Sequence, residues 1–141
     1  MDRQEEALKA IVGLKRVNAH LESIMRQDVH RHNLNVNEFA VLELLYHKGR
    51  QQVQAIKEKI LVANSSTTYL LNKLCEKELC FRQIDENDKR ITYIDLTETG
   101  KKLMAKIFPE HARVLESAVH RLSDGELTQL RFLLKKISGL N

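Results

Sequence analysis

The sequence is poor in the residues that break or cross-link a chain. One proline and five glycines occur among 141 residues, which favours long helices joined by few irregular segments. Cys75 and Cys80 are its two cysteines, too few for a disulfide scaffold or a zinc motif. No apolar run approaches the roughly 20 residues of a membrane-spanning helix, and the N-terminus lacks the basic and apolar regions of a signal peptide. We therefore expect a cytoplasmic protein with no membrane partner.

Signatures of catalysis and of metal binding are also missing. The sequence contains no Gly-rich phosphate loop, no nucleophile elbow and no zinc-protease motif. Six histidines occur, but no two are four residues apart, and His30 and His32 do not share a helix face. The sequence predicts a protein that is not an enzyme and has no cofactor or metal. A metal site assembled across helices stays open as an alternative.

Charge of one sign is in only slight excess. The formal net charge of +4 hints at nucleic acid. Residues 101–141 hold 8 basic and 4 acidic groups, whereas residues 51–100 hold 7 basic and 8 acidic groups. The net charge is therefore weak evidence for nucleic-acid binding, and the positions of individual side chains are more informative.

What the sequence does contain is helical periodicity. Apolar residues recur every three or four positions in five segments. Asp2, Asn35 and Ser123 each stand three residues before a glutamate, the spacing of a capping box. Pro109 should kink its helix or end the first half of it. Amphipathic helices are predicted over 2–32, 36–48, 53–61, 98–122 and 124–140.

The middle of the chain combines a polar-faced helix with a β-hairpin. Asn64 is expected to cap a helix over 65–77. Residues 80–84 and 91–96 are β-rich and flank a polar turn, which predicts a hairpin. The predicted fold is mainly α with a small β-hairpin wing, a winged helix-turn-helix whose N- and C-terminal helices form a dimerisation region.

One face of the 65–77 helix suits the major groove of DNA, because it carries small polar side chains opposite an apolar stripe. In the hairpin turn, Asp88 can hold Arg90 by a charge-assisted hydrogen bond and aim it at the minor groove. The candidate DNA-binding residues are Ser65, Ser66, Thr68, Tyr69, Asn72, Lys73, Arg82, Asp88, Lys89 and Arg90.

A second interpretation of the same residues stays open. An ordinary surface helix followed by a solvated charged turn would show similar patterning. Some winged helices are protein–protein interaction modules, which need no aimed arginine. Salt-dependent binding to duplex DNA separates the two classes, since phosphate contacts release counterions.

Wide apolar stripes on the terminal helices predict a homodimer. One small winged lobe cannot cover these stripes, whereas pairing two chains would. A two-fold dimer predicts a palindromic operator on double-stranded DNA.

Asp88-Lys89-Arg90, followed by Leu96-Thr97-Glu98-Thr99-Gly100, resembles the wing of the MarR family of transcriptional regulators. Residues 64–68 and 72–77 resemble its recognition helix, and the likeness covers essentially the whole chain. Residues 41–49 and 107–111 are similar to the MhqR-type repressors of quinone and catechol detoxification. The resemblance implies one domain over 1–141, with a winged lobe at about 35–98 and dimerisation helices at about 2–32 and 98–140.

Two departures from the family pattern matter. Glu78 stands where the family commonly has glycine before the first hairpin strand, so the local turn is expected to differ. No cysteine lies near the first helix, so the peroxide-sensing mechanism of one subgroup does not carry over.

The resemblance also implies a repressor that a small aromatic, phenolic or quinone-like effector releases. The effector site is expected where the lobe meets the dimerisation helices, near His20, Phe39 and Glu43. The alternative signals are a metal ion, or redox or alkylation chemistry at Cys75 or Cys80, which would require exposed thiolates.

Overall fold

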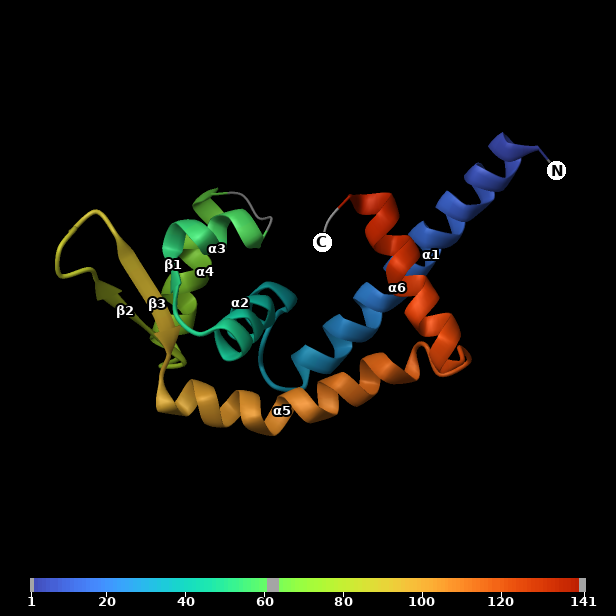
Figure 1. The fold of residues 1–141 in the computed structure, drawn as a ribbon. Helices are drawn as coiled ribbons and strands as arrows, with labels where there is room; N and C mark the ends of the chain where they lie inside the picture. Colours follow the sequence, from blue (N-terminus) through green and yellow to red (C-terminus); the bar gives the residue numbers. More distant parts are fainter. Residues whose placement is uncertain (1, 61–63, 140–141) are drawn as a thin grey trace. The chain divides into compact units, whose positions relative to one another are not determined.

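The computed structural model describes residues 2–60 and 64–139. Its contacts divide the chain into two compact units, Met25–His111 and the pair Met1–Ile24 and Ala112–Asn141. The predicted class is confirmed, since six helices and a small antiparallel sheet are described (Figure 1). None of the described helices is long and apolar enough to cross a membrane.

The unit of Met1–Ile24 and Ala112–Asn141 is helical. It contains most of α1 (Arg3–His30), the end of α5 (Glu98–Ser117) and α6 (Asp124–Ser138). The predicted cap of α6 is confirmed, because Ser123 and Glu126 form a complete capping box. No residue of α6 is buried, and many apolar side chains of α6 and of the first part of α1 are exposed. The largest exposed apolar residues of this unit are Leu8, Ile11, Val12, Val17, Phe132, Leu133, Leu134 and Ile137.

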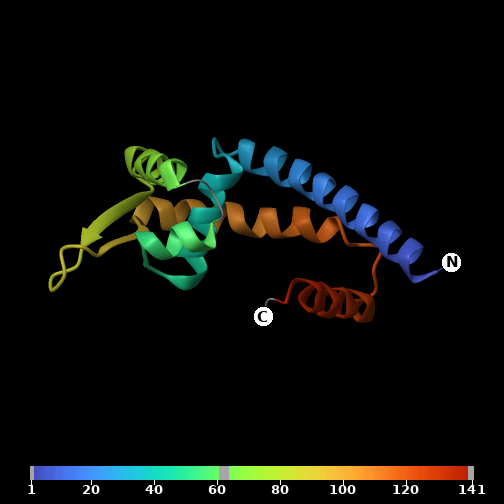
Figure 2. The same ribbon diagram turned by 90° about the horizontal axis from the view of Figure 1, so that it is seen from above.

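The unit Met25–His111 carries the helix-turn-helix and the wing. Its elements are α2 (Val36–Lys48), β1 (Gln51–Gln52), α3 (Val53–Lys59), α4 (Asn64–Glu76), β2 (Cys80–Ile84), β3 (Thr92–Leu96) and the first part of α5. The sheet order is β1-β3-β2 with both pairings antiparallel. Figure 2 shows the turn between β2 and β3 extending away from α2 and α3.

The hydrophobic core of this unit joins all of its helices to the sheet. The fully buried side chains include Phe39, Leu42, Leu71, Ile94 and Met104, which come from α2, α4, β3 and α5. The end of α1 contributes Val29. This core fixes α4 and the hairpin on one body, so the two candidate DNA-contacting elements are held together.

Several predicted boundaries differ from those observed. The third helix ends at Lys59, and Asn64 lies inside α4 rather than before it. The long helix α5 continues through Pro109 but ends at Ser117. The strand β1 was not predicted, because two glutamines alone carry no strand pattern; pairing with Tyr93 and Ile94 of β3 creates it.

The connection from α4 to β2 keeps a left-handed residue although no glycine is present. Glu78 has φ of 62°. The backbone N–H of Leu79 donates to the carbonyl oxygen of Leu74 over 3.0 Å, which closes the end of α4. Glu78 therefore adopts the conformation that usually favours glycine, at a cost in stability of roughly 1–2 kcal/mol.

Candidate nucleic-acid interface

The exposed residues of α4 include Ser66, Thr68, Tyr69, Asn72 and Lys73. The opposite face packs into the core through Leu71 and Leu74, which are fully buried. The side chain of Tyr69 is 65% exposed, and the ammonium of Lys73 lies 5.8 Å from the centre of its ring. Ser65 lies in α4, but its side chain falls outside the described residues. The helix thus presents small polar groups outward, as a helix that enters a groove requires.

An ion pair between a buried carboxylate and a partly exposed ammonium anchors the chain just after α4. The ammonium of Lys77 lies 2.8 Å from Oε2 of Glu38 and donates to the carbonyl oxygen of Asn33 over 2.9 Å. Glu38 also completes the predicted capping box with Asn35 at the start of α2. The sequence indicated the capping box but not Lys77, which lies 39 positions from Glu38 in the chain. This pair fixes α4 against α2.

Asp88 holds Arg90 in the turn of the wing, as the sequence predicted. Nε and Nη2 of Arg90 donate to the two oxygens of Asp88 over 3.0 and 3.1 Å, and the backbone N–H of Arg90 donates over 3.0 Å. The Arg90 side chain is 90% exposed. Hydrogen bonds from Arg90 lower the pKa of Asp88, and the same contact raises the pKa of Arg90. A bidentate pair of this kind limits the rotamers of an otherwise solvated guanidinium.

The turn itself is organised by Asp85. Its Oδ2 accepts the backbone N–H groups of Asn87 and Asp88 over 3.1 and 2.9 Å. Lys89 is exposed beside the Asp88–Arg90 pair, and Arg82 is exposed on β2. The two arginines line one hollow together with Thr68 of α4. The structure therefore brings Thr68, Arg82 and Arg90 together around one hollow, whereas Ser66, Tyr69 and Lys73 line another.

The two cysteines differ in their surroundings. Cys80 is buried in the core, and burial raises the pKa of its thiol to about 12. A thiol with that pKa forms almost no thiolate near neutral pH. Cys75 is half-buried, and Nη1 of Arg82 lies 3.9 Å from its sulfur atom. Of the two, Cys75 is the more accessible and is the one with a cation beside it.

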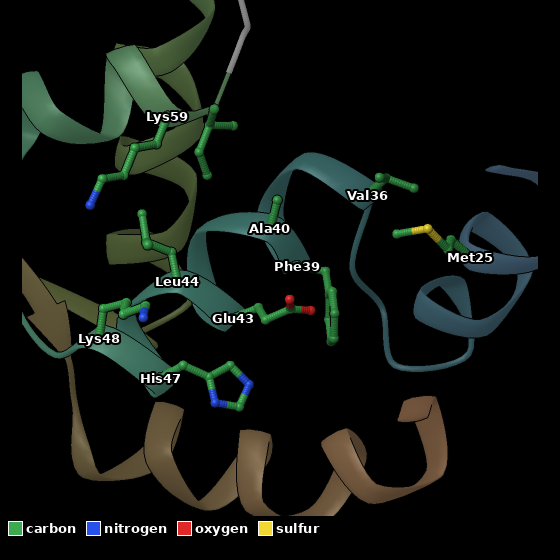
Figure 3. Close-up of a pocket in the computed structure, with 10 residues that line it drawn as sticks. Met25, Val36, Phe39, Ala40, Glu43, Leu44, His47, Lys48 and Lys59 are labelled. Atoms are coloured by element: carbon green, nitrogen blue, oxygen red, sulfur yellow. The ribbon is translucent and has the colours of Figure 1, made fainter. Parts of the chain in front are cut away.

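A separate cavity of about 530 Å³ lies between the end of α1, α2 and the end of α3. Phe39 and Glu43, two of the three predicted effector-site residues, line it, whereas His20 belongs to the other unit and stays a prediction. Figure 3 shows Phe39, Glu43 and His47 side by side along α2. The remaining lining is mostly apolar, with two cations: Met25, Val36, Ala40, Leu44, Lys48, Lys59 and Ile60.

Behind Phe39 lies a buried polar pair that sequence reasoning missed. Nδ1 of His111 on α5 lies 2.7 Å from Oδ2 of Asp28 on α1, and both side chains are 2% exposed. Arg31 contacts the other oxygen of Asp28. The ring centres of Phe39 and His111 are 4.3 Å apart. Across residues 2–60 and 64–139, no three His, Cys, Asp or Glu side chains are grouped as they would be around a metal ion.

Comparison with known proteins gives concordant matches. The model of the MarR family matches residues 34–92. The HTH-type transcriptional regulator MhqR of Bacillus subtilis is 42% identical over 97% of this chain and 94% of its own length. Among solved structures, a mutant of MarR from E. coli complexed with operator DNA has a TM-score of 0.82 at 21% identity, over 97% of this chain and 99% of its own. NadR in complex with 4-hydroxyphenylacetate has a TM-score of 0.78 at 22% identity, over 92% of each chain.

Proposed function

Since the chain belongs to the MarR family of DNA-binding transcriptional regulators, which are not enzymes, we propose that it is a homodimeric repressor of a palindromic operator that a small aromatic molecule releases. The observation that supports this mode of DNA binding is the Asp88–Arg90 pair, since Arg90 lines one hollow together with Thr68 of α4.

In this proposal α4 lies in the major groove and the hairpin turn reaches the adjacent minor groove. Ser65, Ser66, Thr68, Tyr69 and Asn72 read base edges, because hydroxyl and amide groups match the donors and acceptors displayed there. Arg90 enters the minor groove, where its negative potential attracts arginine. The backbone contacts fall to Lys73, Arg82 and Lys89.

The dimer rests on the exposed apolar side chains of α1 and α6. A soluble monomer rarely leaves so many large apolar side chains in contact with water, and a second copy of the chain would cover them. Two-fold symmetry then places two copies of α4 on half-sites about one helical turn apart. An operator with inverted half-sites follows from this symmetry.

The effector site is the cavity lined by Phe39 and Glu43. Its mostly apolar wall with a few polar groups is typical of small-molecule sites. NadR, which has this fold, is solved with 4-hydroxyphenylacetate, and that likeness favours a phenolic or quinone-like effector. Release requires that the effector bind more tightly to the arrangement of the dimer that cannot bind DNA.

Replacing Arg90 with alanine will weaken operator binding by roughly 10- to 100-fold, the usual worth of a good arginine contact. Asp88→Ala will have a smaller effect, because Arg90 remains but is no longer held. Both side chains lie in an exposed turn, so the thermal unfolding midpoint should not move. Fluorescence anisotropy with labelled operator at fixed salt measures the effect. If Arg90→Ala binds as tightly as wild type, Arg90 contributes nothing to the affinity for operator DNA.

The double variant Cys75→Ser, Cys80→Ala will still be released from the operator by catechol or benzoquinone, because reversible binding in the cavity needs no thiol. Alanine is used at position 80 because the site is buried and a hydroxyl there would lack a partner. The measurement is effector titration against a preformed DNA complex. A double variant that binds DNA normally but ignores benzoquinone would show that thiol modification is the signal.

A further inference from the structure

The side chain of Arg50 links the end of α2 to both strands of the hairpin. Arg50 follows Gly49, the C-cap of α2, and comes directly before β1. Its guanidinium lies over the ring of Tyr93 on β3, 4.1 Å from the ring centre, and its Nη1 donates to Oε1 of Gln83 on β2 over 3.4 Å. The negative face of an aromatic ring attracts a cation placed over it. One exposed side chain therefore ties the segment before β1 to β3 and β2.

This contact lies where the three-stranded sheet narrows to a two-stranded hairpin. The pairing of β1 with β3 ends at Gln52, opposite Tyr93, and Gln83 of β2 is opposite Tyr93 on the other side. Beyond this row only β2 and β3 pair, and a two-stranded hairpin by itself is marginally stable. The turn begins at Asp85, two residues after Gln83, and Asp85 accepts the backbone N–H of Asp88. Arg50 is therefore placed to fix the angle at which the wing leaves the sheet.

We propose that Arg50 is a positioning residue for DNA binding, which holds the wing at the angle from which Arg90 reaches the minor groove. This inference rests on the role of Arg90 proposed above. A loop that is already held in its bound conformation loses less conformational freedom when it binds. Arg50 therefore raises the affinity for DNA without touching the DNA.

The surroundings of Arg50 do not favour a direct contact with the phosphate backbone. Its side chain lines a hollow together with the carboxylates of Asp85 and Glu86, whose negative charge repels phosphate. The arginine of the wing lines a separate hollow, together with the cations of Lys57 and Arg82. Arg50 thus differs from the candidate DNA contacts in both its neighbours and its position.

The test is a double-mutant cycle between Arg50→Ala and Arg90→Ala, with operator affinity measured by fluorescence anisotropy at fixed salt. Arg50→Ala alone should weaken binding by about two- to fivefold, the worth of an exposed cation–π contact. In the Arg90→Ala background the same change should cause no further loss, because the wing then lacks the cation that Arg50 positions. Losses at two sites without shared contacts normally multiply, so a missing second loss identifies coupling. The control is Lys106→Ala, which removes an exposed cation from α5 of the same unit and should bind as wild type.

Two variants of Tyr93 test whether the ring is the partner. Tyr93→Phe keeps an aromatic face under the guanidinium and should bind operator as wild type, whereas Tyr93→Leu should match Arg50→Ala. An unfolding midpoint above the assay temperature confirms that each variant is folded.

Wild-type affinity of Arg50→Ala or of Tyr93→Leu would overturn the proposal, as would losses that multiply in the Arg50 and Arg90 double variant. If Arg90→Ala itself binds as tightly as wild type, the wing contact of the proposed function fails and the positioning role fails with it. If Arg90→Ala weakens binding and only the Arg50 and Tyr93 results are negative, the positioning role alone is wrong.

Discussion

Gly100→Ala will lower the free energy of unfolding by about 3 kcal/mol, the upper range for overpacking a tight contact. A Cβ at position 100 would lie 2.2 Å from the backbone carbonyl oxygen of Leu79. That oxygen accepts the backbone N–H of Thr97 over 3.0 Å, and the Thr97 hydroxyl donates to the carbonyl oxygen of Glu78 over 2.6 Å. Because the obstacle is backbone held by two hydrogen bonds, it cannot move aside cheaply.

Urea unfolding followed by circular dichroism measures this loss, and Gly125→Ala is the control. Gly125 lies in α6 with nothing within 4 Å of an added Cβ, so alanine there should be neutral or raise stability by up to about 1 kcal/mol. Equal stability of the two variants would contradict the close approach of α5 to Leu79. The contacts also account for two residues of the 96–100 segment. The Thr97 hydroxyl caps α5 by accepting the backbone N–H of Gly100, and the missing side chain of Gly100 leaves room for the backbone of Leu79.

Asp28→Ala will lower the free energy of unfolding by about 3 kcal/mol, because it leaves a buried hydrogen-bonding group without its partner. The change leaves His111 without its buried acceptor and Arg31 without its carboxylate. Nε2 of His111 is already buried without a hydrogen-bond partner, so no second contact compensates. Glu110→Gln is the matched control, because that side chain is exposed on α5 next to His111.

The same pair predicts how stability depends on pH. Burial tends to raise the pKa of Asp28, but hydrogen bonds from His111 and Arg31 outweigh it, and the net pKa lies below the usual 3.8. A carboxyl whose pKa is lower in the folded state stabilises the protein above its unfolded pKa and loses that contribution as the pH falls through the folded value. Wild type should therefore lose stability below about pH 4 more steeply than Asp28→Asn. Parallel curves for the two proteins would show that Asp28 is not ionised in the fold.

Features that depend on near neighbours in the chain were predictable. The capping boxes of Asn35 and Ser123, the strand Cys80–Ile84 and the Asp88–Arg90 contact each span at most five residues. Periodicity also predicted which face of α4 is exposed. The predicted end of α5 near Leu122 was wrong, since the helix ends at Ser117. The strand β1 was missed because it exists only through its pairing with β3.

The sequence by itself determined the order of the helices and of the hairpin, the polar face of α4 and the cation of the wing. It could do so because hydrogen bonding within a turn and periodicity along a helix act over a few residues. Only the tertiary structure decided the pairing of Asp28 with His111, the anchoring of α4 by Lys77 and Glu38, and the meeting of Lys57 with Arg82 around one hollow. These contacts join residues 25 to 83 positions apart, and their partners are set by how the core packs the helices against the sheet. The periodicity of the sequence does not predict which polar groups this packing brings into contact.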